Sequence, residues 1–373
     1  MSISQRRRLS IERLEARDCP TVYANVVAGN LNITAVNSTS LAVLQLDADS
    51  YQITENGTNV ITRDGVTGSL FIKNVGWRGA DVSIDFAGFG TVKTVSNSFL
   101  TTGANNLSIV NGTITGKLLV VGGIRADSVT LGDGLTSLDV NGHATVNLFA
   151  GGGDNLTVND AVTFGSSLST SLIENVTLAA GSTVTQNAIF GAGLQGNTYN
   201  LEGAVNGSVW YTGGLGSDSF TTSATSTIGD DLNIALLAGT DTVDLGGAIT
   251  DNLRISSAWF PGNKTVNLGG SVGNNAVVLL GFGSDTVNFT GSIANTLTLS
   301  TSFGNDTVTF DDASIVTTAN VNLGPGNDTF NLGAAATVTN GTINGFIGSD
   351  TCNGTAAVSF PNLTVINFEI LNP

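Results

Sequence analysis

Apolar and polar residues alternate in short runs that recur about every 22 residues along the chain. A typical run is DTVDL at residues 241–245, in which an Asp is followed by Thr and then by apolar, polar and apolar positions. Alternation with a period of two and many β-branched residues is typical of a β-strand with one buried face. The position of the Asp falls at residues 218, 241, 264, 285, 306, 328 and 350, at intervals of 23, 23, 21, 21, 22 and 22 residues. A fixed interval of this length predicts a solenoid of stacked coils.

Weaker copies of the run extend the series upstream to about twelve coils; they occupy residues 105–109, 127–131, 154–158, 174–178 and 197–201. Two further alternating segments recur within each coil, such as those at 232–234 and 247–249. The fold class we predict is therefore all-β, a parallel β-helix with about three short strands per coil of about 22 residues. Equivalent apolar residues then form inward columns: Val243, Val266, Val287, Val308, Phe330 and Cys352 in one, and Leu245, Leu268, Phe289, Phe310 and Leu332 in the next. Cys352 is thus expected to act as a small core residue.

The pattern divides the chain into four parts. Residues 105–354 carry the regular coils, and residues 21–104 form an atypical β region at their N-terminal side. Residues 355–373 contain Phe360, Val365, Phe368 and Ile370, and we expect them to cover the open end of the rod. Residues 1–20 are a separate N-terminal motif.

The charge of the chain is unevenly distributed. Residues 1–125 have eleven Lys and Arg against nine Asp and Glu, whereas residues 126–373 have two against twenty, a net charge of −18. Such an acidic surface repels nucleic acid and attracts cations. The single histidine, His143, provides no partner for a histidine-based metal cluster and is interpreted as a turn residue.

Stacking places the acidic positions of successive coils about 5 Å apart, where ionised carboxylates repel each other. Calcium prefers oxygen ligands in such places. The segment GGLGSDSFT at 213–221 matches the whole nonapeptide G-G-x-G-x-D-x-U-x, and residues 281–287 and 324–330 match it in part. Residues 197–355 therefore resemble the RTX calcium-binding repeats. The resemblance implies calcium between the glycine-rich turns, with the ligands Asp218, Asp285, Asp306, Asp328 and Asp350.

The resemblance has a clear departure, since RTX repeats run in tandem whereas the motif here occurs once in about 22 residues. An alternative is that each Asp only accepts hydrogen bonds from backbone N–H groups at the corner of its own coil, as in an Asx turn. Lys264 stands at the Asp position between Asp241 and Asp285 and interrupts the acidic column. We expect it to form a surface ion pair with its neighbours, worth less than about 1 kcal/mol.

Two further hypotheses concern ligand binding by the outer face of the rod and catalysis on acidic sugars. Threonines and asparagines beside the apolar columns form a flat array that is suited to binding sugar, such as surface polysaccharide, or ice. The alternative is that Thr favours strands and that Asn ladders bond along a stack. Three-faced β-helices include pectate lyases and related enzymes, which use Arg or Lys on acidic sugars. Beyond residue 125 only Arg254 and Lys264 remain for that role. We therefore predict that the chain is not an enzyme, with a carbohydrate-active lyase or hydrolase as the alternative.

The N-terminal residues 8–20 have the pattern R-x-x-x-E-x-L-E-x-R-x-x-P. They resemble the LEPR-XLL-like leader of planctomycete-type surface proteins, which implies export or sorting. An amphipathic helix ending at Pro20 is the alternative.

No apolar run of transmembrane length occurs in the sequence. Together these features predict an extracellular or cell-surface solenoid, associated with calcium and structural or adhesive in role. A metal-free binding module is a further alternative.

Overall fold

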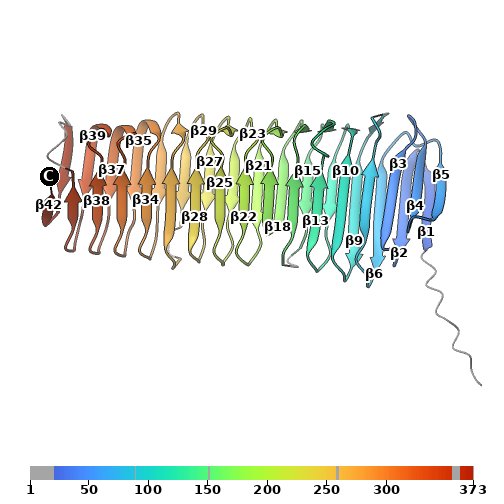
Figure 1. Cartoon of the computed structure of the whole chain (residues 1–373), viewed down its shortest axis with the longest axis horizontal. Helices are drawn as coiled ribbons and strands as arrows, with labels where there is room; N and C mark the ends of the chain where they lie inside the picture. Colours follow the sequence, from blue (N-terminus) through green and yellow to red (C-terminus); the bar gives the residue numbers. More distant parts are fainter. Residues whose placement is uncertain (1–20, 89, 150–151, 258–259, 355–361, 373) are drawn as a thin grey trace, which may run out of the picture.

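A computed structural model describes residues 21–88, 90–149, 152–257, 260–354 and 362–372. These residues form a straight rod of stacked coils that runs from β1 (Thr21–Val27) at one end to β42 (Ile370–Asn372) at the other (Figure 1). The described part of the chain contains no helix, and therefore none that could cross a membrane. The predicted parallel β-solenoid is confirmed, with about 13 turns.

The first strand of each coil begins at the Asp position or directly after it, and these strands pair in parallel to form one side of the rod. They are β7 (Asp81–Asp85), β10 (Asn105–Val110), β13 (Asp127–Leu131), β16 (Asn155–Val158), β19 (Asn175–Leu178), β22 (Thr198–Leu201), β25 (Ser219–Thr222), β28 (Asp241–Leu245), β31 (Lys264–Leu268), β34 (Thr286–Phe289), β36 (Thr307–Phe310), β38 (Thr329–Leu332), β40 (Thr351–Asn353) and β42. The pairing keeps equivalent residues in register, as with Val266 opposite Val287.

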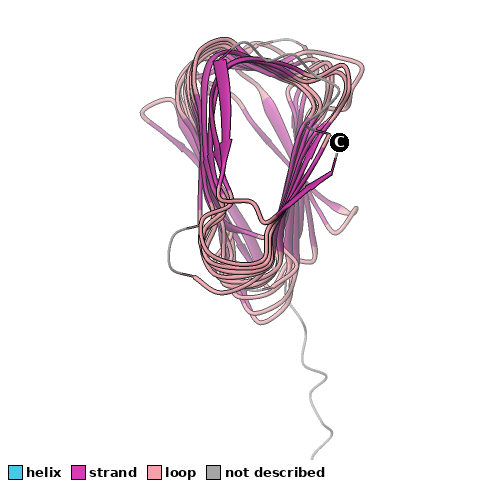
Figure 2. Cartoon of the chain, turned by 90° about the vertical axis from the view of Figure 1, so that its left-hand side faces the viewer, coloured by secondary structure: helices cyan, strands magenta, loops and turns pink. Residues whose placement is uncertain are grey.

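A second sheet contains the other two strands of each coil (Figure 2). The shorter strands are β8 (Thr91–Val92), β11 (Gly112–Ile114), β14 (Leu138–Val140), β17 (Val162–Phe164), β20 (Thr183–Val184), β23 (Ala204–Val205), β26 (Thr227–Ile228), β29 (Ala248–Ile249) and β32 (Ser271–Val272). The longer strands are β9 (Val95–Thr101), β12 (Leu118–Val121), β15 (Ala144–Asn147), β18 (Leu168–Ile173), β21 (Ala188–Ala192), β24 (Val209–Thr212), β27 (Leu232–Ala235), β30 (Leu253–Ser256) and β33 (Ala276–Leu279). Towards the C-terminus one continuous strand replaces the two, in β35 (Ser292–Ser300), β37 (Ile315–Asn322) and β39 (Thr337–Asn344).

Antiparallel strands close the N-terminal end of the rod. β1 pairs with β2 (Asn30–Val36), and β3 (Ser40–Gln45) pairs with β4 (Tyr51–Glu55), which pairs in turn with β5 (Asn59–Arg63). β6 (Leu70–Gly76) then pairs in parallel with both β2 and β9. Parallel stacking thus begins before residue 105, since β7 already pairs in parallel with β10. A hairpin at the end of a stack leaves fewer strand edges free to pair with other chains.

The core lies between the two sheets and follows the predicted alternation. Strands of the first sheet bury every second side chain, and both predicted apolar columns are buried, including Cys352 at 0% exposure. Burial raises the pKa of the Cys352 thiol to about 11, as expected for a core residue. Each buried aliphatic or aromatic side chain contributes about 1.5–3 kcal/mol, and no coil can bury its own side chains alone.

At the C-terminal end, β41 (Asn362–Ile366) and β42 extend the two sheets by one more coil. Val365 and Phe368 pack against the core, whereas Ile370 and Leu371 remain 45% and 58% exposed. Part of the predicted cap, including Phe360, lies outside the described residues, as does the N-terminal motif at 1–20.

Candidate functional site

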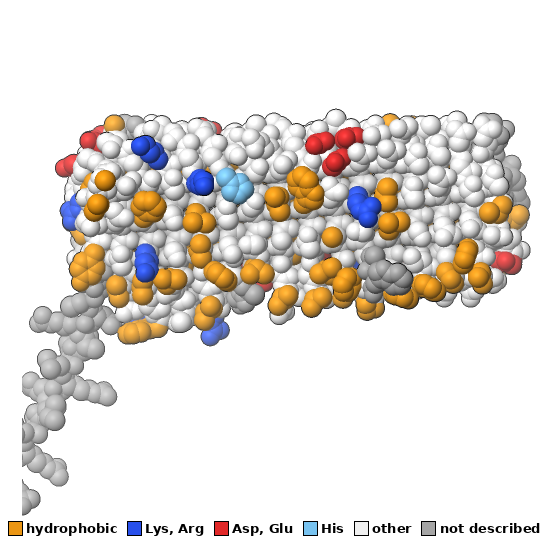
Figure 3. Space-filling view, turned by 180° about the vertical axis from the view of Figure 1, so that it is seen from behind, with side chains coloured by type: hydrophobic (Ala, Val, Ile, Leu, Met, Phe, Trp, Pro, Cys, Tyr) orange, Lys and Arg blue, Asp and Glu red, His pale blue; other side chains and the backbone are white. Residues whose placement is uncertain are grey.

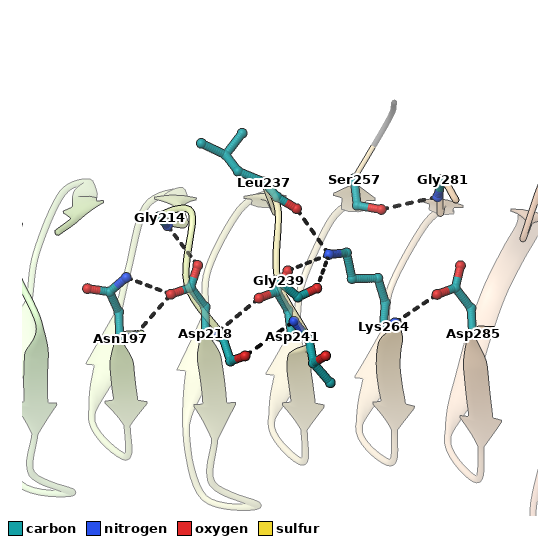
Figure 4. Close-up of polar contacts among 12 residues, drawn as sticks. Asn197, Gly214, Asp218, Leu237, Gly239, Asp241, Ser257, Lys264, Gly281 and Asp285 are labelled. Atoms are coloured by element: carbon teal, nitrogen blue, oxygen red, sulfur yellow. Dashed lines mark hydrogen bonds and ion pairs between the residues drawn. The ribbon is translucent and has the colours of Figure 1, made fainter. Parts of the chain in front are cut away.

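The residues at the Asp position lie at the corner where each first-sheet strand begins, either directly before the strand or as its first residue. Figure 4 shows Asp218, Asp241, Lys264 and Asp285 at this corner in successive coils. They are almost completely buried, with exposed fractions of 2% or less. The residues with these exposed fractions are Asp127, Asp154, Asp218, Asp241, Lys264, Asp285, Asp306, Asp328 and Asp350, and Glu174 and Asn197 hold the same position in the two coils between Asp154 and Asp218. We refer to them as the buried carboxylate column. Burial matters because a charge removed from water must find a partner or change its protonation.

In most of these carboxyl groups, one oxygen accepts a hydrogen bond from a backbone N–H of the preceding coil and so links two coils. Oδ1 of Asp306 accepts a hydrogen bond of 2.7 Å from the backbone N–H of Asp285, and Oδ1 of Asp328 accepts one of 2.8 Å from Asp306. Equivalent bonds reach Asp241, Asp285 and Asp350. The Asx-turn alternative expected such bonds within one corner, whereas these bonds run between successive coils. The Asp therefore has a structural use that needs no metal.

The glycine two positions before the Asp is also explained by stacking. Gly304 has a φ of +147°, and a Cβ placed there would lie 1.7 Å from the carbonyl oxygen of Gly283 in the preceding coil. A side chain cannot fit in such a contact, and the backbone conformation is one that glycine adopts readily. The G-x-D part of the RTX-like motif thus has a packing reason that is independent of calcium.

The second carboxyl oxygen divides the five predicted calcium ligands into two groups. Oδ2 of Asp218 accepts a 2.7 Å hydrogen bond from the N–H of Gly214, a glycine of the full nonapeptide match. By contrast, Oδ2 is buried and has no hydrogen-bond partner in the four remaining residues, which are Asp285, Asp306, Asp328 and Asp350. These four occupy consecutive coils. The coil with the best motif match is therefore the one whose own backbone already satisfies the carboxylate.

The side chains of Lys264 and Asn197 show which chemical groups the corner accommodates. The ammonium group of Lys264 lies 2.8 Å from Oδ2 of Asp241, and it donates hydrogen bonds to the carbonyl oxygens of Leu237 at 3.0 Å and Gly239 at 2.7 Å. These carbonyls stand four and two positions before Asp241 in the chain. In another coil, Nδ2 of Asn197 donates to the carbonyls at the same two offsets, those of Gly193 and Gln195. The corner thus presents oxygen atoms to a cation or to a hydrogen-bond donor.

Our expectation of a surface ion pair at Lys264 is wrong. The lysine is 1% exposed, and the side chains of both partners in the pair with Asp241 are fully buried. The long side chain reaches back one coil into the interior because its ammonium group finds three oxygen atoms there. Breaking such a buried pair by removing one partner costs about 3–5 kcal/mol, far more than an exposed pair contributes.

Burial also shifts the protonation of the column. It raises the pKa of Asp285, Asp306 and Asp328 to about 6, against the opposing effect of the backbone hydrogen bond that each receives. Burial raises the pKa of Asp218 and Asp350 as well. The physical cause is that the ionised form loses water without a full set of replacement donors.

A second acidic group, on the outside of the rod, was missed by the sequence reasoning. Oxygens of Asp230, Asp231 and Asp251 lie within 4.8 Å of one another, in partly exposed positions. Several of these oxygens already accept hydrogen bonds, for example from Ser208 to Asp230 at 2.9 Å and from Asn252 to Asp231 at 2.9 Å. The available signal was the Asp-Asp pair followed by another Asp 20 to 21 residues later, about one coil further on.

The predicted Thr and Asn face is present on the first sheet. Thr286, Thr307 and Thr329 stand opposite one another in successive strands, and the asparagines beside them form a ladder that Thr309 interrupts. Asn288 donates to Asn267 at 2.8 Å and Asn353 to Asn331 at 2.7 Å, so these amides bond along the stack as expected. Part of the hydrogen-bonding capacity of these amides is therefore used within the stack.

Comparisons with family models, curated proteins and solved structures return no match for this chain.

Proposed function

We propose that the chain is an extracellular or cell-surface rod with a structural or adhesive role, in which the C-terminal coils bind cations, with calcium as the first candidate. The observation that supports this proposal is the set of four consecutive buried carboxyl groups whose Oδ2 has no partner, at Asp285, Asp306, Asp328 and Asp350. A buried ionised carboxylate without a partner is costly, so a bound cation would stabilise these coils.

The donor atoms at these corners suit a hard cation. They are a carboxylate oxygen and backbone carbonyl oxygens, which calcium prefers, and the ammonium group of Lys264 already occupies the corresponding place beside Asp241. For Asp306, the carbonyls at the same offsets belong to Ser302 and Gly304. Calcium takes six to eight oxygen ligands, and each coil supplies one free carboxylate oxygen, so most ligands would be carbonyl groups of the corners. Asp218 fits less well, because Gly214 already donates to its Oδ2.

A proton competes for the same oxygen atoms. A protonated Asp donates a hydrogen bond to a corner carbonyl, as the amide of Asn197 does, and no metal is then needed. The pKa values of about 6 mean that protons would fill the sites in acid, whereas ionised oxygens are exposed to cations at neutral pH. A protonated column and a calcium-bound column are thus expected to respond to pH in opposite directions: the first loses stability as the pH rises, and the second gains it.

The scaffold role is favoured over the lyase alternative by the position of the basic residues. Residues 126–373 contain two basic residues. Lys264 is held inside the rod by Asp241, so Arg254, which is exposed on the second sheet, is the one left to contact a substrate. Proton abstraction from an acidic sugar needs basic groups that converge on the substrate. A rod with continuous flat sheets instead suits a spacer or a repetitive binding surface.

The test is thermal unfolding of the full chain at pH 7.5 with calcium, with magnesium and with a chelator. We expect calcium at millimolar concentration to raise the Tm by several degrees and the chelator to reverse the effect. An unchanged Tm, together with no heat of binding in titration calorimetry, would remove calcium from the proposal. The surface location is tested separately, by protease accessibility of the protein on intact cells.

A further inference from the structure

We infer that the rod associates side by side with a second copy of itself through an exposed apolar ridge. The ridge lies at the outer apex of the corner, three positions before the buried carboxylate column. In eight consecutive coils this apex carries an apolar residue; the eight are Leu194, Leu215, Ala238, Pro261, Phe282, Phe303, Pro325 and Ile347. We call these eight residues the apolar ridge.

Six of the eight ridge residues are exposed, and the other two, Ala238 and Pro325, are half-buried. Leu194 is 63% exposed, Phe303 49% and Ile347 65%, and Phe260 and Phe346 add further exposed apolar area beside it. Backbone bridges pair Pro261 with Phe282 and Phe282 with Phe303, which keeps the apex residues in register along the rod. Figure 3 shows hydrophobic side chains gathered along one long edge of the molecule towards its C-terminal half.

The ridge carries no charge, in contrast to the rest of the coils. At the apex and at the two positions after it, all eight coils have only apolar residues, Gly, Ser, Thr, Asn or Gln. The chain as a whole has a formal net charge of −16. An uncharged apolar strip on a highly acidic protein is typical of an interaction surface and is unfavourable in water.

The size of the ridge suits a dimer of standard size. Successive coils are about 4.8 Å apart, so eight apices span roughly 34 Å. Seven exposed leucine, isoleucine and phenylalanine side chains on and beside the ridge have exposed fractions of 39–65%. At about 200 Å² for each side chain they offer on the order of 700 Å² of apolar surface. A standard interface buries about 800 Å² on each partner.

The chemistry of the ridge favours a second copy over other partners. The rings of Phe282 and Phe303 stack on each other, with centroids 5.2 Å apart and an interplanar angle of 15°, so one face of each ring is covered by the other ring and is closed to a sugar. An anionic membrane would be repelled by the acidic coils, as a second copy is, but it lacks the regularly spaced apices that a second rod offers. A second rod has the same coil spacing, so its apices can fit between these apices along the whole strip. A two-fold arrangement also makes the contact closed and self-complementary.

The experiment is sedimentation velocity of the full chain from about 1 to 100 μM, at low and at moderate salt. We expect a monomer–dimer equilibrium that tightens as salt screens the repulsion between two acidic copies. The double variant Phe282→Ser, Phe303→Ser should weaken the dimer at least tenfold. Ile347→Asp should do the same, and it is the second test if the double variant misfolds. Leu135→Ser is the matched control, since Leu135 is 88% exposed away from the ridge.

Three results would overturn the inference. The first is a wild-type protein that remains monomeric at 100 μM, and the second is a set of ridge variants that dimerise as tightly as the control. The third is a monomer that floats with neutral phosphatidylcholine vesicles, which would assign the ridge to lipid. Circular dichroism and thermal melting of each variant separate loss of association from loss of fold.

Discussion

Replacing Asp306 by Asn tests the buried carboxylate column directly. The substitution is nearly isosteric, and the Asn oxygen can still accept the hydrogen bond from the N–H of Asp285. Asn already occupies this position in another coil, where Asn197 donates to the carbonyls of its corner. The variant therefore keeps the corner and removes one buried charge. Its effect reports on that charge together with the repulsion between it and Asp328, which raises the pKa of Asp328 in addition to burial.

The magnitude follows from the pKa of Asp306, which burial raises from 3.8 to about 6. A raised pKa means that the protonated folded form is favoured. The stabilising effect is full below about pH 4, falls as the pH passes through 6, and is absent above about pH 7. A shift of about two units corresponds to about 3 kcal/mol. Without calcium, we expect the free energy of unfolding of the wild type to fall by up to about 3 kcal/mol more than that of the Asn variant between pH 4 and pH 8.

The assay is urea unfolding at a series of pH values, with a chelator and with calcium. Calcium binds the ionised form, so at pH 7.5 it should stabilise the wild type by about 2.7 kcal/mol at a concentration 100 times its Kd, with a smaller gain in the variant. The control is Asp244→Asn, because Asp244 lies on the outer face and accepts a hydrogen bond from Asn267. Equal pH dependence in wild type and Asp306→Asn would refute the burial argument. If calcium raised the free energy of unfolding of Asp306→Asn and of Asp244→Asn by the same amount, Asp306 would be refuted as a calcium ligand.

The remaining predictions concern the interior and the corners. Lys264→Met should lower the free energy of unfolding by about 3–5 kcal/mol, because it leaves Asp241 buried and unpaired, and adding Asp241→Asn should restore much of it in the same urea assay. Gly304→Ala should lower the Tm far more than Gly134→Ala, since both have positive φ but only the former places a Cβ against backbone; equal Tm losses would contradict this. Val287→Asp should unfold several coils by burying an unpaired charge in the core, visible as lost β signal in circular dichroism.

The amino-acid sequence by itself determined the solenoid, the length of its coils and its inward columns. Alternation with a period of two fixes which face of a strand is buried, and the interval of 21–23 residues fixes which residues stack. Val287 and Phe310 could therefore be placed in the core from the sequence. Both are buried in register with their equivalents in the next coil.

Only the tertiary structure decided what the corner residues do. A corner has no alternating period, so the sequence does not tell whether an Asp there faces water or the interior. Lys264 was expected at the surface and lies inside, because stacking brings its ammonium group to the corner of the preceding coil, where Asp241 and two carbonyl oxygens lie together. The same motif leaves Oδ2 satisfied at Asp218 and unpaired at Asp306, since the backbone conformation of each turn decides whether an N–H reaches the carboxylate.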